Sequence, residues 1–413
     1  MERTIVGIDV GTTKICTLVG EATDNDLRIV GVGIAPARGI KKGVVVNVVD
    51  AAAAIKASIE KAERSSGYEI ARAFVSVTGA HISALNSRGV VGVSRGERGI
   101  SGEDVNRALE AARAIAIPQD REVLHVIPRG YTIDGQDGVK EPIGMSGFRL
   151  EVEAHIVTGQ TSSIHNLLKC VENCNVGVDG LALAAIASGA AALSENEQDM
   201  GVVLADIGGG TTDLAIFIEG SVWHTTVLAV GGAHITNDIA VGLRLPAEVA
   251  EQLKLEHGHA RYETIDPTEV VQVKAFGDGG LTRVQRRDLA EIIEARTEEI
   301  YQLILQEIKR SGYDGLLPAG VVVTGGTAQL RGMRDLGRQV LSLPVRIGQP
   351  QGISGLIDTV DSPAFATPVG LLLWGRDQAG QPVLGPDKDN VERPVWGERL
   401  SGFFKKLLPD RNT

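Results

Sequence analysis

The sequence predicts an α/β protein of two related lobes, with an inserted small α+β subdomain and an amphipathic helix near the C-terminal end. Three observations support this prediction. A glycine-containing hairpin occurs twice, at 4–19 and at 202–218. A compact unit at 84–158 lies between the two copies and closes with a segment of period-2 hydrophobicity. A polar, proline-containing stretch at 376–394 precedes a final apolar and cationic segment.

The turns of the two hairpins resemble each other in sequence. Residues 9–14 read Asp-Val-Gly-Thr-Thr-Lys, and residues 206–213 read Asp-Ile-Gly-Gly-Gly-Thr-Thr-Asp. If one inserted residue is allowed, both contain Asp-x-Gly followed by Thr-Thr. A spaced duplication of a specialised turn indicates two related half-molecules that face each other.

Such turns are suited to hold phosphate groups, because backbone N–H groups approach a ligand closely where glycine leaves room. Threonine hydroxyls add donors, and a carboxylate can hold Mg²⁺ directly or through its waters. We therefore expect Asp9 and Asp206 to hold Mg²⁺ and Lys14 to place its charge on a β-phosphate. The predicted phosphate-site residues are Asp9, Gly11, Thr12, Thr13, Lys14, Asp206, Gly208, Gly209, Gly210, Thr211 and Thr212. For either turn taken alone, an ordinary glycine-rich hairpin is the alternative.

Other signals are missing from the chain. It has no Gly-x-x-x-x-Gly-Lys-Ser/Thr motif, and no Gly-x-Gly-x-x-Gly opens a helix after the first strand. The net charge of −11 offers no basic footprint, so we expect no nucleic-acid partner. Three cysteines fit a reducing cytoplasm. We expect no signal peptide and no membrane-spanning helix, because no apolar run approaches the roughly 20 residues that a span needs.

Helix signals place elements in the first half of the chain. Asp50 is expected to cap a helix that runs through Arg64 and can end at Gly67. A second helix begins at Ser101, with Asp104 completing a capping box. A third begins at Thr161, and its apolar face consists of Ile164, Leu167, Leu168 and Val171. Next to that face we expect Cys170 and Cys174 to pack in the core, because a metal or redox pair lacks further ligands.

The second half continues the α/β pattern. A helix follows Gly231-Gly232, and Pro246 opens another that runs through His257. A long helix covers about 288–309, and the buried strand 321–324 runs into Gly325-Gly326-Thr327 and a further helix. The folded body is expected to end near Gly375.

This layout resembles the superfamily of actin, Hsp70 and the sugar kinases, and within it the FtsA family of bacterial division proteins. The resemblance covers nearly the whole chain. It is carried by the segments 7–14, 125–128, 142–147, 206–213, 289–296, 323–330 and 345–348. It implies a two-lobed actin-like ATPase fold with duplicated ribonuclease-H-like lobes that clasp ATP and Mg²⁺.

The resemblance also implies contacts to the nucleoside. Glu251 and Lys254 share one helix face, and they would meet the ribose hydroxyls and the adenine side. A solvated ion pair is the alternative for these two residues. The remaining implied nucleotide-binding residues are Gly231, Gly232, Gly325, Gly326 and Thr327. The sequence identifies no catalytic base, so we expect ATP binding with at most weak ATPase activity. His234 is expected to pack in the core or cap its helix.

The resemblance divides the chain into subdomains. Subdomain 1A covers 1–83, 161–197 and 351–375, interrupted by the FtsA-type subdomain 1C at 84–160, which would contact the next subunit of a filament. Subdomain 2A covers 198–230 and 315–350, and subdomain 2B covers 231–314. A flexible linker at 376–394 then leads to a membrane-targeting helix and tail at 395–413.

The C-terminal segment has the pattern of a helix that lies in the plane of a membrane surface. On a helical wheel its apolar residues fall within an arc of roughly 140°, and lysines lie on the other side, where they suit anionic headgroups. The predicted membrane-binding residues are Trp396, Leu400, Phe403, Phe404, Lys405, Lys406, Leu407 and Leu408. A terminal helix docked on the body is the alternative.

Together these features predict a scaffold at the division site, bound peripherally to the cytoplasmic face of the inner membrane. The resemblance implies self-assembly, binding of the C-terminal peptide of the ring protein FtsZ, and recruitment of later division proteins. Arg283, Arg286 and Arg287 are candidate contacts for an acidic peptide, with solvated charges as the alternative. Two other functions remain open: an actin-like pilus-assembly protein of the PilM type, and a sugar or acetate-type kinase.

Overall fold

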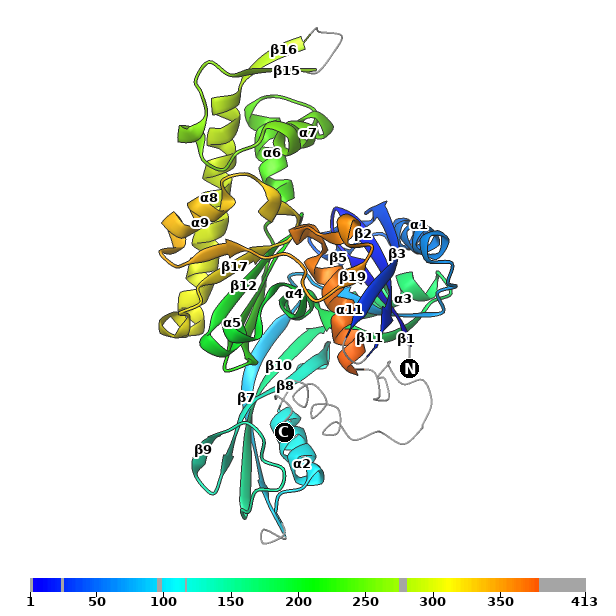
Figure 1. The fold of residues 1–413 in the computed structure, drawn as a ribbon, viewed down its shortest axis with the longest axis vertical. Helices are drawn as coiled ribbons and strands as arrows, with labels where there is room; N and C mark the ends of the chain where they lie inside the picture. Colours follow the sequence, from blue (N-terminus) through cyan, green and yellow to red (C-terminus); the bar gives the residue numbers. More distant parts are fainter. Residues whose placement is uncertain (1–2, 24–25, 95–98, 116, 275–280, 379–413) are drawn as a thin grey trace.

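The computed structural model describes residues 3–23, 26–94, 99–115, 117–274 and 281–378 (Figure 1). The first lobe holds a six-stranded sheet in the order β11-β6-β1-β2-β3-β19. Its strands are β1 (Arg3–Val10), β2 (Lys14–Ala22), β3 (Leu27–Pro36), β6 (Arg72–Val77), β11 (Gly177–Leu183) and β19 (Ser354–Gly355). Its main helices are α1 (Val48–Ser66), α3 (Thr161–Glu172), α4 (Ala184–Ala192) and α11 (Ala366–Gln378). The predicted hairpin at 4–19 is confirmed as β1 and β2.

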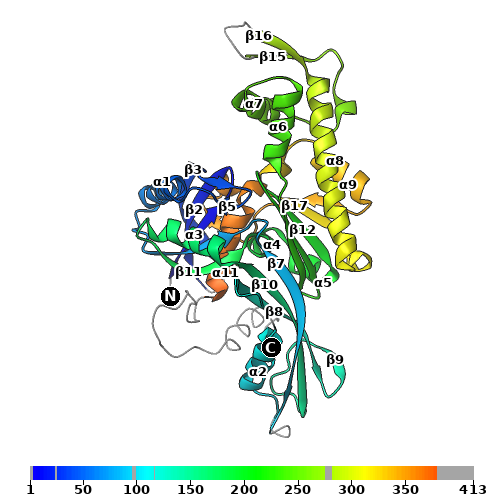
Figure 2. The same ribbon diagram turned by 180° about the vertical axis from the view of Figure 1, so that it is seen from behind.

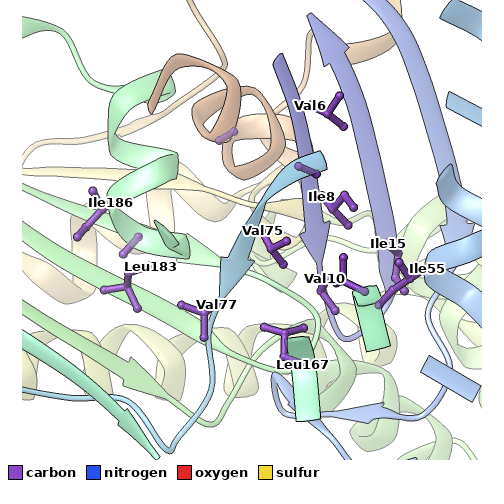
Figure 3. Packing of buried hydrophobic residues seen from close by; sticks show 14 of the residues in the cluster. Val6, Ile8, Val10, Ile15, Ile55, Val75, Val77, Leu167, Leu183 and Ile186 are labelled. Atoms are coloured by element: carbon purple, nitrogen blue, oxygen red, sulfur yellow. The ribbon is translucent and has the colours of Figure 1, made fainter. Parts of the chain in front are cut away.

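Aliphatic side chains from the sheet and its helices form the core of the first lobe (Figure 3). Ile8 on β1, Ile15 on β2 and Ile55 on α1 are each fully buried. Burying a side chain of this size contributes about 1.5–3 kcal/mol. The turn between β1 and β2 therefore projects from a rigid base.

The second lobe holds a five-stranded sheet in the order β14-β13-β12-β17-β18. Its strands are β12 (Val202–Ile207), β13 (Thr212–Ile218), β14 (Ser221–Leu228), β17 (Val321–Thr324) and β18 (Val345–Ile347). The helices of this half are α5 (Glu195–Met200), α6 (Gly232–Gly242), α7 (Ala247–His257), α8 (Arg286–Ser311) and α9 (Met333–Leu341). The second predicted hairpin is thus confirmed as β12 and β13. A separate pair, β15 (Val270–Lys274) and β16 (Leu281–Gln285), forms the far tip of this lobe (Figure 1).

The third unit is a four-stranded sheet, β7-β10-β8-β9, covered by one helix. Its elements are β7 (Ser83–Gly92), α2 (Gly102–Arg113), β8 (Arg121–Ile133), β9 (Gln136–Val139) and β10 (Arg149–Gln160). It lies at the opposite end of the molecule from β15 and β16 (Figure 2). The capping box of Ser101 and Asp104 is confirmed. The predicted period-2 strand is present as β10. Its second half is buried on both faces, because Val157 packs in the first-lobe core and His155 forms a hydrogen bond with Thr225 of the second lobe.

Several predicted boundaries were wrong. Asn47, not Asp50, caps α1, because its Oδ1 accepts hydrogen bonds from the N–H groups of Val49 and Asp50 at 3.0 and 3.2 Å. Helix α8 begins at Arg286, before the expected start. Gly326–Gln329 forms a short 3₁₀ helix, and the α-helix predicted there begins only at Met333.

The end of the body also lies slightly later than predicted. Helix α11 continues through Gln378, so 376–378 are helical rather than the start of a linker. The rest of that linker and the amphipathic segment 395–408 lie outside the described residues. Within the part of the chain that the structure describes, no helix is both long and apolar enough to cross a membrane. Cys170 is buried and Cys174 half-buried, as expected for core packing.

Candidate functional site

The turns of the two predicted hairpins touch each other. A carbon added to Gly209 would lie 1.8 Å from Thr13 Oγ1, and one added to Gly210 would lie 2.6 Å from Thr12 Oγ1. The threonines of the first lobe therefore lie directly against the glycines of the second. A side chain at either glycine would displace these hydroxyls, so the turn residues chosen from the sequence are brought together at one place between the lobes.

Three carboxylates surround this contact, and hydroxyl groups hold each of them. Ser76 Oγ donates to Asp9 Oδ1 at 2.7 Å. Asp213 accepts from Thr78 Oγ1 at 2.5 Å and from Thr211 Oγ1 at 3.0 Å. Because Thr78 follows β6 of the first lobe and Asp213 lies on β13 of the second, the hydrogen bond between them joins the lobes.

Asp206 is held by the two helices that cross between the lobes. Thr367 Oγ1 at the start of α11 donates to Asp206 Oδ2 at 2.7 Å, and Ser188 Oγ of α4 bonds the same oxygen. The helices cross closely, since a carbon added to Gly370 would lie 1.8 Å from the carbonyl oxygen of Ala187. The orientation of Asp206 therefore depends on the helix crossing.

Burial changes the acidity of all three carboxyl groups. Burial raises the pKa of Asp9 to about 6, although the hydrogen bond from Ser76 and the charge of Lys14 oppose the shift. It raises the pKa of Asp213 to about 7, and the charge of Asp206 adds to the effect. The pKa of Asp206 is also raised by burial. A cation near these carboxyl groups would favour their charged forms.

The raised pKa of Asp213 predicts a dependence of stability on pH. The folded protein holds this proton more tightly than the unfolded chain, so the stabilisation is fully present below the ordinary pKa of 3.8 and is lost as pH rises through about 7. Between pH 6 and pH 8 the free energy of unfolding should fall by about 1.4 kcal/mol from this group.

Asp213→Asn should remove that contribution. Urea unfolding of protein freed of nucleotide and metal, at pH 6 and at pH 8, checks it. At pH 6 the variant and the unaltered protein should have similar free energies of unfolding. At pH 8 the free energy of unfolding of the variant should be the higher of the two. Equal losses in both proteins between the two pH values would contradict this assignment.

Lys14 lies at the rim of the same site. Its Nζ donates to the carbonyl oxygen of Ala364 at 2.8 Å and lies 3.7 Å from the centre of the Phe365 ring. Both partners belong to the short segment before α11. An ammonium held at this point, next to the turn that carries it, is suited to pair with a phosphate as a point charge.

The second turn is tied to the start of α6 and to the segment after β17. Gly208 O accepts from Gly232 N at 2.9 Å and from Thr327 Oγ1 at 3.0 Å. Gly231 N donates to His234 Nδ1 at 3.2 Å, which confirms the expected capping role of that histidine. Gly325, at φ 86°, lies so close to Asp206 that a side chain would meet its Oδ1 at 2.4 Å.

Glu251 and Lys254 are paired and half-buried rather than solvated. Lys254 Nζ donates to Glu251 Oε2 at 2.7 Å, to Thr236 Oγ1 at 2.8 Å and to Gly232 O at 3.2 Å. The pair therefore fastens α7 to α6 beside the predicted glycines. Its role toward a nucleoside stays a prediction.

Sequence reasoning missed the carboxylate of Asp213 and four hydroxyl residues that orient the carboxylates: Ser76, Thr78, Ser188 and Thr367. These four are isolated hydroxyls in apolar surroundings, and no local pattern marks them. Asp213 did carry a signal, because it directly follows the Thr-Thr of the second turn.

The three arginines proposed for an acidic peptide lie far from these turns, where β16 enters α8. Arg286 is already engaged, since it pairs with Glu269 at 2.5 Å and donates to His257 O at 3.1 Å. Arg287 lies over the ring of Tyr262 at 5.4 Å. Arg283, on β16, is exposed. Of the three, Arg283 is therefore the most available to a partner.

The chemical groups at the two turns are of the types that can bind Mg²⁺-ATP. Glycine amides, threonine hydroxyls and a lysine can hold phosphates. Mg²⁺ keeps several waters and uses one or two carboxylates together with phosphate oxygens, and Asp9 and Asp206 could supply them. Among the described residues no cluster of three or more metal-binding side chains occurs, so a metal held by protein groups alone does not fit.

Comparison with protein families gives two matches. The family described as "Cell division protein FtsA" matches residues 203–370. The family described as "SHS2 domain inserted in FTSA" matches residues 79–158, which overlap nearly all of the predicted 84–160 unit. Among curated proteins, the chain is 44 % identical to the cell division protein FtsA of Pseudomonas aeruginosa, covering 97 % of this chain and 94 % of that one. It is 37 % identical to FtsA of Escherichia coli K12, covering 98 % of each.

Solved structures with the same fold are more distant in sequence. A PilM–PilN type IV pilus biogenesis complex aligns with a TM-score of 0.64 at 16 % identity, covering 90 % of this chain and 98 % of that one. MreB5 of Spiroplasma citri bound to ADP aligns with a TM-score of 0.53 at 15 % identity, covering 89 % of this chain and 94 % of that one. These likenesses show the fold alone, and they confirm the two-lobed actin-like architecture with an inserted subdomain.

Proposed function

The chain belongs to the FtsA family of cell division proteins, and from this membership we propose that it is an ATP-dependent scaffold that anchors FtsZ filaments to the membrane. In this proposal it binds Mg²⁺-ATP between its lobes, assembles with copies of itself on the cytoplasmic membrane face, and recruits later division proteins. Its ATPase activity is weak at most.

The observation that carries the ATP proposal is the meeting of the two turns from separate lobes. Thr12 and Thr13 lie against Gly210 and Gly209, with hydroxyl-bonded carboxylates around them. A ligand with several phosphates would be gripped by both lobes at once, so binding energy would favour their closure.

The membrane proposal rests on the sequence of the segment 395–408, in which aromatic and aliphatic residues share one face and lysines another. We expect the intact protein to sediment with anionic liposomes, and a chain ending at Gln378 to stay in solution. Replacing Phe403 and Phe404 with serine should also release the protein, because apolar burial is lost.

Glu398→Gln is the matched control, since it changes the polar face of the segment only. If the shortened chain sediments as well as the intact one, the segment is not the anchor. Sedimentation with and without Mg²⁺-ATP measures whether nucleotide promotes assembly on the membrane.

We also propose that the exposed side of β16 receives the C-terminal peptide of FtsZ. Arg283→Glu should weaken binding of this acidic peptide by about tenfold, because a charged contact becomes a repulsion. Arg283 is the sharper probe, as Arg286 and Arg287 already contact Glu269 and Tyr262. Fluorescence anisotropy with a labelled peptide measures the effect.

Arg334→Glu provides the control for net charge, since Arg334 is exposed on α9 of the same lobe. Its peptide affinity should equal that of the unaltered protein, and both variants should bind ATP normally. Equal affinity of Arg283→Glu and the unaltered protein would remove this surface from the proposal.

A further inference from the structure

A short hairpin of the first lobe lies against the candidate nucleotide site. It consists of β4 (Ile40–Lys41) and β5 (Val44–Val45), paired antiparallel. Its two turn residues, Lys42 and Gly43, have φ values of 50° and 75°. Two consecutive positive φ values are typical of a type I′ turn, which makes the tip narrow and rigid.

The tip fits tightly into the first lobe. A carbon added to Gly43 would lie 2.9 Å from Gly79 Cα and 3.0 Å from the carbonyl carbon of Thr78. These are backbone atoms, which cannot move aside as the end of a flexible side chain can. Gly43 is therefore required twice, once for its positive φ and once for the close approach.

From this position the tip reaches the first phosphate-site turn. Gly43 N donates a hydrogen bond to Thr12 Oγ1 at 3.0 Å. A hydroxyl that accepts from an N–H group must point its own hydrogen elsewhere. Within the described parts of the chain, no residue accepts a hydrogen bond from Thr12 Oγ1. On its other side this oxygen faces Gly210 of the second turn.

We propose that the Gly43 amide positions the Thr12 hydroxyl so that it donates its hydrogen to the phosphate chain of a bound nucleoside di- or triphosphate. Gly43 is thus a positioning residue of the nucleotide site, although it lies outside both turns. The same tip packs on Thr78, whose hydroxyl holds Asp213 of the second lobe. This inference rests on the ATP binding proposed above.

Gly43→Ala should weaken the affinity for Mg²⁺-ATP by about tenfold, measured by isothermal titration calorimetry on the full chain, because one oriented hydrogen bond is lost. Gly67→Ala is the matched control. Gly67 also has a positive φ, 77°, but nothing lies within 4 Å of the added carbon. It should carry the same backbone strain and keep the ATP affinity of the unaltered protein.

A double-mutant cycle separates positioning from a general loss of structure. Thr12→Val removes the hydroxyl, so adding Gly43→Ala to it should weaken ATP binding no further. A full additional loss in that background would overturn the proposal, as would normal affinity of Gly43→Ala alone. If the unaltered protein does not bind ATP, the proposed function itself fails, and this inference fails with it.

Discussion

Gly370→Ala should lower the free energy of unfolding by about 3 kcal/mol, toward the upper end of the range for overpacking. The added carbon would lie 1.8 Å from the carbonyl oxygen of Ala187 and 2.4 Å from its carbonyl carbon. Both are backbone atoms of α4, so α11 must move away. Urea unfolding followed by circular dichroism measures the loss.

Gly102→Ala is the control for this substitution. Gly102 begins α2, and nothing lies within 4 Å of the carbon that alanine would add. Since alanine favours a helix over glycine by up to about 1 kcal/mol, this variant should be as stable as the unaltered protein or more so. Equal stability of Gly370→Ala and Gly102→Ala would contradict the close helix crossing.

The second large effect is expected from Gly209→Ala, which should weaken Mg²⁺-ATP binding by about a hundredfold. The added carbon would lie 1.8 Å from Thr13 Oγ1 and 3.1 Å from Thr13 Cβ, so the Thr13 hydroxyl must leave its place or the two turns must separate. Groups that grip the phosphates from both sides would then no longer act together, and misplacement by about 1 Å is costly at such sites. Equilibrium dialysis with labelled ATP measures the affinity.

Gly208→Ala sharpens this comparison within the same turn. Its added carbon would lie no closer than 3.3 Å to any neighbour, and the nearest atom is the carbonyl oxygen of Thr211. The loss of affinity should therefore be much smaller than for Gly209→Ala. Similar losses of ATP affinity in the two variants would contradict a role for the contact between Gly209 and Thr13 in ATP binding.

Much of the fold was predictable because its signals are local. The repeated turns, the capping box at Ser101 and the helix after Thr161 each depend on a few neighbouring residues. Boundaries failed where two local signals competed, as at Asn47 and Asp50. Asparagine at 47 accepts from two backbone N–H groups, and this decided the start of α1.

The candidate site was predictable only in part, for a physical reason. Its backbone groups belong to glycine-rich turns, and glycines are visible in a sequence. The hydroxyls that orient the carboxylates come from distant positions, as Thr367 and Ser188 do for Asp206. Single threonines and serines in apolar helices carry no pattern, so only the packing of α4 against α11 reveals them.

The central proposal, that the two turns together bind Mg²⁺-ATP, is tested most directly by isothermal titration calorimetry of the intact protein with ATP. We expect one saturable site per chain with Mg²⁺, and weaker binding after chelation of the metal, because Asp9 and Asp206 then face the phosphates without a cation between them. The absence of saturable binding, or an affinity indifferent to Mg²⁺, would contradict the proposal.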